Sequence, residues 1–306
     1  MPIRQKCIVL VCKGVTYVKK ITKAVIPAAG LGTRMLPIAR AVAKEMLPIV
    51  DRPAISYLVE EAKKSGITDI LIIMGRGKGA IEDYFDMSPE YEESFREKGR
   101  ESDIKALREE YEGVNIFYIR QHRANGLGAA ILAAESFTGD EPFAVLYGDD
   151  IIFSEKPVTR QLMDAYEALG EIVVGVQSVP PSDLVKYSTL LVDRFGDNLY
   201  KVLDMKEKPQ SDSEILSDLA ILGRVILTPY IYKALRNTPL GHGGELQLTD
   251  ALASMSREGA VSALYFDGKR YDLGSKTGFI KANVDLALQH PETAEEIKEY
   301  IKSLNL

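Results

Sequence analysis

The stretch AVIPAAGLGTRMLPIARAVAK, residues 24–44, decides how this chain folds. It begins with a short apolar run that ends at Ala28-Ala29-Gly30, and a glycine-rich turn follows. A base or a phosphate can approach the backbone N–H groups of such a turn closely, because glycine has no side chain. Arg34 and Lys44 lie just beyond the turn, where their positive charges can neutralise phosphate. The stretch therefore predicts a buried strand that leads into an anion-binding turn.

The composition limits the class of protein. The chain has 306 residues, of which 46% are hydrophobic, and this is enough for a large core. Its net charge is −6, whereas a nucleic-acid-binding protein usually carries a basic patch and a high pI, so we expect no nucleic-acid partner. Any anionic ligand must then be held by a local cluster of Arg and Lys or through a metal.

The cysteines and the apolar runs indicate the compartment. Cys7 and Cys12 are the only cysteines, and four residues separate them, so neither a disulfide framework nor a cysteine-based zinc site is expected. The apolar run between them is far too short to span a membrane or to serve in a secretory signal. We therefore expect a cytoplasmic protein with no membrane partner.

From Lys23 onward, strand patterns alternate with helix patterns. Strands are expected at 24–29, 69–74, 114–119, 142–147, 171–178, 190–193, 219–227 and 260–266. Helices are expected at 53–66, 79–85, 127–137, 230–236, 248–257, 275–290 and 294–304, with further amphipathic helices in the charged segment 86–112. This alternation predicts an α/β fold with three layers, α/β/α, around a mainly parallel, mixed central sheet of Rossmann-like type.

The chain shows no Pro/Ser-rich linker and no internal repeat. Residues 1–20 precede the first clear element and are expected to form an N-terminal extension, in which 8–11 could add an edge strand. Residues 21–306 are expected to form a single domain around one continuous sheet. Its parts would be a nucleotide-binding half at about 21–150, a second half at about 151–290 and a C-terminal helix at 291–306.

The turn Gly30-Leu31-Gly32-Thr33-Arg34 matches neither of the two common nucleotide-binding patterns. It lacks the Walker sequence, and Met35 stands where the dinucleotide fingerprint needs its third glycine. An ordinary tight turn between a strand and a helix is the plain alternative. Arg34 and Lys44 favour a ligand site instead, because both would lie at the carboxyl end of the first strand, where open α/β sheets bind ligands.

Ala28–Arg34, together with Lys44–Pro48, resembles the signature of the sugar-nucleotide pyrophosphorylases and is most similar to the UTP–glucose-1-phosphate uridylyltransferases. Further motifs follow in the family's order and at its spacing: Gln121 with 126–128, then 148–149, 207–209, 218–220 through 223–224, 244–250 and 271–274. The likeness runs from about Lys23 to His290. The charged insertion at 86–112 also resembles the uridylyltransferase branch.

This resemblance implies a nucleotide-diphospho-sugar transferase fold and an enzyme of sugar-nucleotide biosynthesis. Such an enzyme converts UTP and glucose 1-phosphate to UDP-glucose and pyrophosphate by in-line attack at the α-phosphorus, with Mg²⁺ as cofactor. Two polyanions must meet, so the site needs cations and positioning more than a covalent nucleophile. Relatives often form dimers or tetramers, and we expect a homo-oligomer here.

The resemblance also assigns roles to individual residues. The catalytic residues implied are Arg34, Lys44 and Lys208. The nucleotide-binding residues implied are Ala28, Ala29, Gly30, Gly32, Thr33, Glu45, Gln121 and Gly126. The sugar-binding residues implied are Ser188, Glu207, Lys208 and Gly223. The metal ligands implied are Asp149 and Asp272, since two carboxylates at sheet ends suit Mg²⁺ when phosphate oxygens complete its shell. The amide of Gln121 offers one donor and one acceptor, as the edge of uracil requires.

The chain departs from the family pattern at two places. Ser188 stands where the relatives usually have glycine beside the sugar, so its hydroxymethyl group could reshape the hexose pocket. The metal motif reads Tyr-Gly-Asp-Asp at 147–150, where the branch commonly has Leu-Pro-Asp. We interpret Asp150 as a helix cap or turn residue and leave it outside the site.

Three alternative functions stay open. A thymidylyltransferase using dTTP is the nearest, because thymine and uracil differ by one methyl group and such a difference seldom gives more than about 10–200-fold discrimination. A regulatory paralogue could bind sugar nucleotides without turnover, although Arg34, Lys44, Asp149, Lys208 and Asp272 are all present. An NAD-dependent oxidoreductase is disfavoured because the last glycine of the fingerprint is missing.

Overall fold

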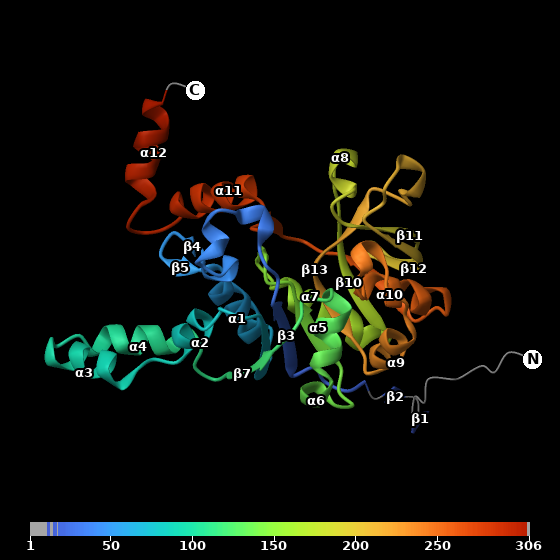
Figure 1. Ribbon diagram of the computed structural model, residues 1–306, viewed down its shortest axis with the longest axis horizontal. Helices are drawn as coiled ribbons and strands as arrows, with labels where there is room; N and C mark the ends of the chain where they lie inside the picture. Colours follow the sequence, from blue (N-terminus) through green and yellow to red (C-terminus); the bar gives the residue numbers. More distant parts are fainter. Residues whose placement is uncertain (1–10, 13–14, 17, 305–306) are drawn as a thin grey trace, which may run out of the picture.

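The computed structural model describes residues 11–12, 15–16 and 18–304, and in this part of the chain nine strands form one central sheet (Figure 1). The strands follow the order β10-β14-β12-β11-β13-β8-β3-β6-β7. Their bounds are β3 Lys23–Ala28, β6 Asp69–Met74, β7 Asn115–Arg120, β8 Phe143–Leu146, β10 Ile172–Ser178, β11 Ser188–Arg194, β12 Leu199–Glu207, β13 Leu219–Leu227 and β14 Val261–Tyr265.

Short strands and turns lie outside this sheet. The two-residue strands pair as β1 Val11–Cys12 with β2 Val15–Thr16, and as β4 Pro48–Ile49 with β5 Arg52–Pro53. A further ribbon pairs β9 Asp150–Phe153 with β15 Lys269–Asp272. The 3₁₀ turns η1 Thr33–Met35 and η3 Lys44–Met46 follow β3.

The helices are α1 Ala54–Lys64, α2 Ala80–Phe85, α3 Pro89–Glu97, α4 Glu101–Glu109, α5 Leu127–Ala133, α6 Glu135–Thr138, α7 Val158–Leu169, α8 Pro181–Leu184, α9 Tyr230–Asn237, α10 Leu248–Arg257, α11 Lys276–Ala287 and α12 Ala294–Ser303. The insertion 86–112 forms the α3–α4 pair, which projects from the body of the molecule (Figure 1). No helix in the described residues has the length and apolar character needed to cross a membrane.

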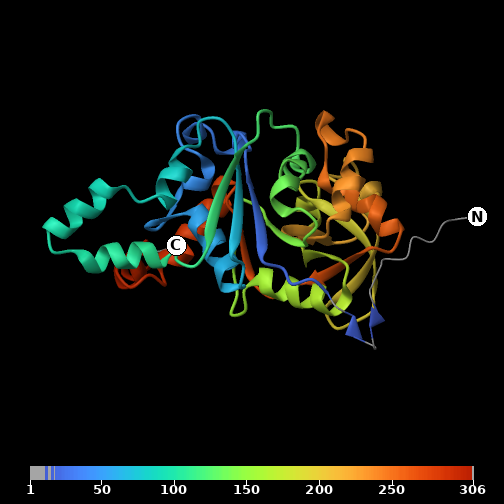
Figure 2. The same cartoon turned by 90° about the horizontal axis from the view of Figure 1, so that it is seen from below.

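Side chains of β3 alternate between the two faces of the sheet, and this explains why the strand is apolar throughout. Ala24, Ile26 and Ala28 pack in the cluster that contains residues of α1 and α7. Val25 packs in the cluster that contains residues of α5, α9 and α10. Figure 2 shows helices on both sides of the sheet. The predicted α/β fold with three layers and a mixed sheet is confirmed.

Fewer neighbouring strands are parallel than the sequence pattern indicated. Strands β8, β3, β6 and β7 are parallel neighbours, as are β10 and β14. β13 runs antiparallel to β8 and β10, and β11 and β12 form an antiparallel pair. The second half is therefore largely antiparallel, because its neighbouring strands β11 and β12 are joined by a short turn and need no crossover helix.

Several elements differ from the sequence-based prediction. The expected helix 127–137 is divided into α5 and α6 at Ala134. Strands β9, β12 and β15 and helix α7 were not predicted. In β12 only Val202 and Met205 are buried, which is too sparse an apolar pattern to reveal a strand. The possible edge strand at 8–11 lies outside the described residues except for Val11, which belongs to β1.

A buried ion pair joins both halves of the sheet behind the carboxyl end of β8. Arg224 of β13 is 1% exposed, and its Nε and Nη2 atoms lie 2.9 and 2.5 Å from the carboxylate of Glu61 on α1. The same carboxylate accepts hydrogen bonds from the backbone N–H and hydroxyl of Thr159 on α7. Arg224 Nη1 also donates to the carbonyl of Asp150 at 3.1 Å. The pair therefore fixes the start of β9.

We predict that Arg224→Met destabilises the protein by about 3–5 kcal/mol, because it leaves the Glu61 carboxylate buried without a counter-charge. The free energy of unfolding from urea denaturation measures this. Lys64→Met is the matched control, since Lys64 lies on the same helix as Glu61 but is exposed and pairs with Glu60. A loss in Arg224→Met no larger than in the control would contradict the assignment.

Candidate active site

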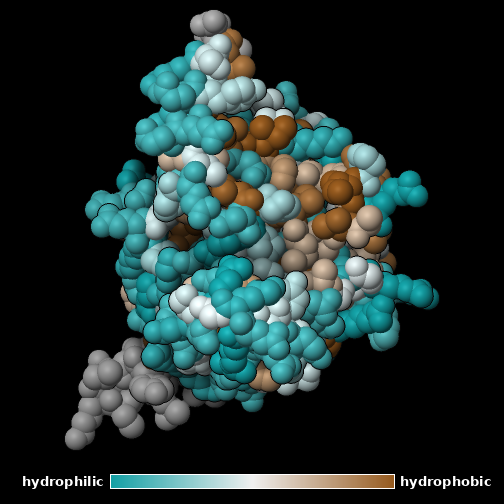
Figure 3. All heavy atoms as spheres, turned by 90° about the vertical axis from the view of Figure 1, so that its left-hand side faces the viewer, coloured by the Kyte–Doolittle hydropathy of each residue, from teal (hydrophilic) through white to brown (hydrophobic). Residues whose placement is uncertain are grey.

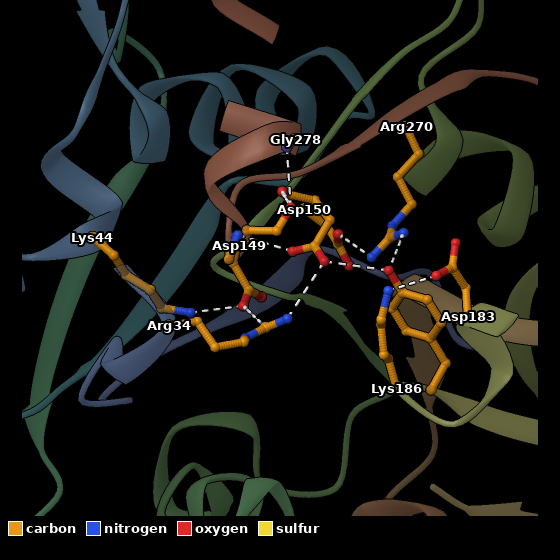
Figure 4. Close-up of polar contacts among 12 residues, drawn as sticks. Arg34, Lys44, Asp149, Asp150, Asp183, Lys186, Arg270 and Gly278 are labelled. Atoms are coloured by element: carbon orange, nitrogen blue, oxygen red, sulfur yellow. Dashed lines mark hydrogen bonds and ion pairs between the residues drawn. The ribbon is translucent and has the colours of Figure 1, made fainter. Parts of the chain in front are cut away.

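Two cations and two carboxylates meet beyond the carboxyl ends of β3 and β8 (Figure 4). Lys44 Nζ lies 2.7 Å from Asp149 Oδ2. The guanidinium of Arg34 lies between the carboxylates, with Nη2 3.6 Å from Asp149 Oδ2 and Nη1 3.5 Å from Asp272 Oδ2. The structure thus brings together Arg34, Lys44, Asp149 and Asp272, although they are up to 238 positions apart in the sequence.

Two glycines allow this convergence. Gly32, before η1, has a left-handed backbone with φ +66°, which a side chain would strain. A Cβ on Gly148 would lie 2.8 Å from the carbonyl oxygen of Pro27, so only glycine lets the chain after β8 approach β3 this closely. Gly32 therefore allows the turn after β3 to form, and Gly148 allows the chain after β8 to lie against the end of β3.

The charges of this cluster shift the pKa of Lys44 and of Asp149. Burial opposes the charge of Lys44, but Asp149 and Glu45 outweigh it and raise the pKa of the ammonium group. Burial likewise opposes ionisation of Asp149, but Lys44 and Arg34 lower the pKa of its carboxyl group. The pair is therefore fully charged at neutral pH.

Asp150 belongs to this cluster, contrary to its interpretation as a cap or turn residue. It is 4% exposed, and its Oδ1 forms an ion pair with Arg270 Nη2 at 2.6 Å. Burial raises the pKa of Asp150 to about 6; Arg270 opposes this shift, while Asp149 and Asp272 add to it. The register of β9 with β15 sets Asp150 opposite Asp272. This pairing is not visible in the sequence, although Arg270 stands immediately before a recognised motif.

Glu45 lies behind the turn and does not face a ligand directly. It is 0% exposed, and its Oε2 accepts a 2.7 Å hydrogen bond from Lys78, which also donates to the carbonyl of Ala28. Its Oε1 has no hydrogen-bond partner among the described residues. Burial raises the pKa of Glu45 and lowers that of Lys78. Glu45 therefore supports the turn through Lys78, a partner that the motif did not reveal.

The expected sugar-binding residues form a hydrogen-bonded group on β11, β12 and α10. Glu207 Oε2 accepts hydrogen bonds from Ser188 Oγ at 2.5 Å and Thr249 Oγ1 at 2.7 Å. Its Oε1 lies 3.4 Å from Lys208 Nζ. Lys208 itself has a left-handed backbone, φ +41°, and its N–H donates to the carbonyl of Tyr187. Thr249 was not among the predicted site residues.

The remaining predicted residues lie in strands β3 and β13 and in the turns that follow β3 and β7. Ala28 and Ala29 are buried, whereas Gly30 and Thr33 are exposed. Gln121 directly follows β7, where its N–H donates to the carbonyl of Met74. Gly126 has φ +98° and packs on the carbonyl of Leu246. Gly223 has φ +70° and packs on the side chain of Asp150.

Asp149 and Asp272 provide carboxylate oxygens of the kind that hold a small divalent ion. A Cβ placed on Gly274 would lie 2.9 Å from Asp149 Oδ2 and 2.9 Å from Asp272 Oδ1, so the absence of a side chain there keeps the space open. Two carboxylates are the protein ligands that Mg²⁺ commonly uses beside phosphate oxygens and water. In residues 18–304 no three acidic, His or Cys side chains gather around one point, so a metal here would need ligands from the substrates.

Comparison with known proteins decides the family. Residues 23–289 match the family described as nucleotidyl transferase. This chain belongs to the nucleotidyl transferase family. A UTP–glucose-1-phosphate uridylyltransferase, YngB of Bacillus subtilis, is 50% identical over 94% of this chain and 96% of its own length. A uridylyltransferase of the same name from Staphylococcus epidermidis is 47% identical over 94% of this chain and all of its own.

Solved structures agree with this assignment. A UDP-glucose pyrophosphorylase from Acinetobacter baumannii matches with a TM-score of 0.86 at 34% identity, covering 93% of this chain and 99% of its own. A UDP-glucose pyrophosphorylase complexed with UDP-glucose matches with a TM-score of 0.81 at 39% identity, covering 88% of this chain and 100% of its own. The nucleotidyl transferase fold therefore extends over nearly the whole chain.

We predict that Gly274→Ala lowers turnover about a hundredfold, because the added methyl group displaces Arg34 and both carboxylates by a fraction of an ångström. Backbone strain is not expected, since Gly274 does not have positive φ. Steady-state rates and the melting temperature together measure the effect. Gly79→Ala is the control, because a Cβ there meets nothing within 4 Å among the described atoms. Equal rates in the two variants would show that the space is not used.

Proposed function

We propose that this nucleotidyl transferase is a UTP–glucose-1-phosphate uridylyltransferase, which forms UDP-glucose and pyrophosphate. The observation that carries the proposal is the single cluster of Arg34, Lys44, Asp149 and Asp272 at the carboxyl end of the sheet. Its balanced charges suit a reaction between two polyanions. Relatives that are 47–50% identical over 94% of the chain carry the same name.

The residues divide the chemistry between them. Lys208 binds the phosphate of glucose 1-phosphate, and Glu207 accepts hydrogen bonds from the sugar hydroxyls. An oxygen of that phosphate attacks the α-phosphorus of UTP in line, and the bond from this phosphorus to the bridging oxygen breaks as pyrophosphate leaves. Arg34 and Lys44 bind the triphosphate and compensate the charge that develops on the departing pyrophosphate.

Asp149 and Asp272 are the residues that would hold Mg²⁺. When bound, the ion reduces the repulsion between the two phosphates and polarises the α-phosphorus. The carboxylates supply two negative oxygens that face one small space, and Arg34 between them holds them at this separation.

The base subsite favours a pyrimidine. We assign its floor to the backbone of 28–30 and its edge contact to the amide of Gln121. A putative glucose-1-phosphate thymidylyltransferase from Bacillus anthracis is 25% identical with a TM-score of 0.66, well below the uridylyltransferase relatives. The alternative dTTP-dependent reaction is therefore not favoured.

Pyrophosphate release from each triphosphate paired with each sugar 1-phosphate, with Mg²⁺ present, tests the proposal. UTP with glucose 1-phosphate should give the highest kcat/KM. A preference for dTTP would overturn the nucleotide assignment, and tight UDP-glucose binding with no turnover would instead support a regulatory protein. The comparison among sugar 1-phosphates also tests the effect of Ser188 on the hexose pocket, because the hydroxyl of Ser188 donates a hydrogen bond to Glu207.

We also propose the organisation of the chain. Residues 21–306 form one nucleotidyltransferase domain with a nucleotide-binding half at 21–150, a sugar-binding half at 151–290 and the C-terminal helix, and residues 1–20 are an extension. The metabolite substrates support a cytoplasmic location.

We propose further that two or four copies of the chain associate through α11 and α12. Ile280 and Tyr300 are each 59% exposed, and Val284 and Ile301 are also exposed. Figure 3 shows hydrophobic residues exposed in the upper part of the molecule. Ile301→Glu should lower the molecular mass measured by light scattering. An unchanged mass would place the interface elsewhere.

We predict that Asp149→Ala lowers kcat by roughly a hundredfold or more, because a metal contributes several kcal/mol of charge stabilisation. UTP should still bind weakly through the turn and Arg34. Stopped-time assays and equilibrium binding measure the two effects separately. Asp183→Ala is the control, since Asp183 is an aspartate that pairs with Lys186 at the surface. Wild-type turnover in Asp149→Ala would refute the metal role.

We predict that Lys208→Ala raises KM for glucose 1-phosphate about tenfold or more and leaves KM for UTP nearly unchanged, since one charge-assisted contact is lost. Lys206→Ala provides the comparison, because Lys206 lies on the same strand but pairs with Glu214. If the sugar-phosphate KM of Lys208→Ala equals that of Lys206→Ala, the phosphate clamp is assigned to the wrong lysine.

A further inference from the structure

Tyr187, just before β11, connects the sugar-binding residues to the carboxylate of Asp272. We propose that Tyr187, held in place by Arg270 and Asp150, is a positioning residue that orients Asp272 for a divalent cation. This inference rests on the proposed metal role of Asp149 and Asp272. It adds three residues to those that the resemblance implied for the site: Tyr187, Arg270 and Asp150.

Asp272 is held through both of its oxygens. Its Oδ1 accepts a 2.9 Å hydrogen bond from the backbone N–H of Gly274. Its Oδ2 accepts a 3.2 Å hydrogen bond from the hydroxyl of Tyr187 and lies 3.5 Å from Arg34 Nη1. Arg34 is 57% exposed, whereas Tyr187 is half-buried, so the tyrosine is the more rigid of the two partners on Oδ2.

Tyr187 is in turn fixed from three directions. The guanidinium of Arg270 lies over its ring at 4.8 Å, and Arg270 Nη1 donates to the hydroxyl oxygen at 3.2 Å. Arg270 is anchored by its ion pair with Asp150, whose side chain is only 5% exposed. The carbonyl of Tyr187 accepts a hydrogen bond from the N–H of Lys208.

These contacts give the hydroxyl a direction. Because Arg270 donates to the oxygen, the single hydroxyl proton is left to donate to Asp272. A series of polar contacts therefore runs from Asp150 through Arg270 and Tyr187 to Asp272. Arg34 continues it to Asp149. Phenylalanine would keep the stacked ring but lose the donor, so the hydroxyl can be tested alone.

The experiment measures Mn²⁺ binding by electron paramagnetic resonance in the presence of saturating UDP-glucose. Tyr187→Phe should weaken Mn²⁺ binding about tenfold, the loss expected for one hydrogen bond to a charged group. Arg270→Met should weaken it in the same direction, because Tyr187 then loses its anchor. UDP-glucose binding without divalent cation and the melting temperature of Tyr187→Phe should change little.

Tyr232→Phe is the matched control, because its hydroxyl also forms a side-chain hydrogen bond, to Thr138, but its ring stacks on Phe143 at the opposite end of β8. Unchanged Mn²⁺ affinity in Tyr187→Phe would overturn the inference. Asp272→Asn distinguishes failure of the proposed metal site from failure of the proposed role of Tyr187. If it too leaves Mn²⁺ affinity unchanged, the proposed metal site itself fails, whereas a loss in Asp272→Asn alone leaves the site intact and rejects the role of Tyr187.

Discussion

The ion pairing of Asp149 with Lys44 and Arg34 is the interaction on which the site depends. A carboxylate that is largely shielded from water becomes ionised only if nearby cations offset the desolvation cost. Here the two cations do so and lower the pKa of Asp149. The same cations are the groups that a triphosphate would attract, so the carboxylates and the substrate phosphates compete for them. A divalent cation would relieve this competition, because it would supply positive charge to both.

The fold creates this cluster through the direction of its strands. The parallel strands β3 and β8 end at the same edge of the sheet, and this places Arg34 and Lys44 beside Asp149. Asp272 is placed in the cluster by the antiparallel pairing of β15 with β9. Since β9 begins directly after Asp149, the ribbon aligns the two carboxylates. Both connections are needed, because only the first belongs to the Rossmann-like part of the fold.

The sequence predicted those features that a local pattern encodes. The buried strand β3, the glycine turn and the charged residues Arg34 and Lys44 follow one another closely, so their neighbourhood could be inferred. The pairing of Asp150 with Arg270 could not, because it depends on the register of two strands over a hundred residues apart. An aspartate at a strand end has the same local pattern whether it caps a turn or forms a buried ion pair.

The environment of Glu45 likewise could not be predicted from the sequence. The motif predicts that Glu45 binds nucleotide, and in the structure its side chain is buried and pairs with Lys78. Two such buried pairs, Glu45 with Lys78 and Asp150 with Arg270, lie immediately behind the charged groups, and Glu61 with Arg224 lies behind these. Buried pairs contribute little net stability compared with apolar side chains of the same size. They do fix directions, since the cation of each pair also donates to a backbone carbonyl or to a tyrosine of the site. The geometry of the charged cluster is therefore maintained by these buried ion pairs. Their partners Lys78, Arg270 and Glu61 lie outside the motifs, so the motif residues alone do not define the site.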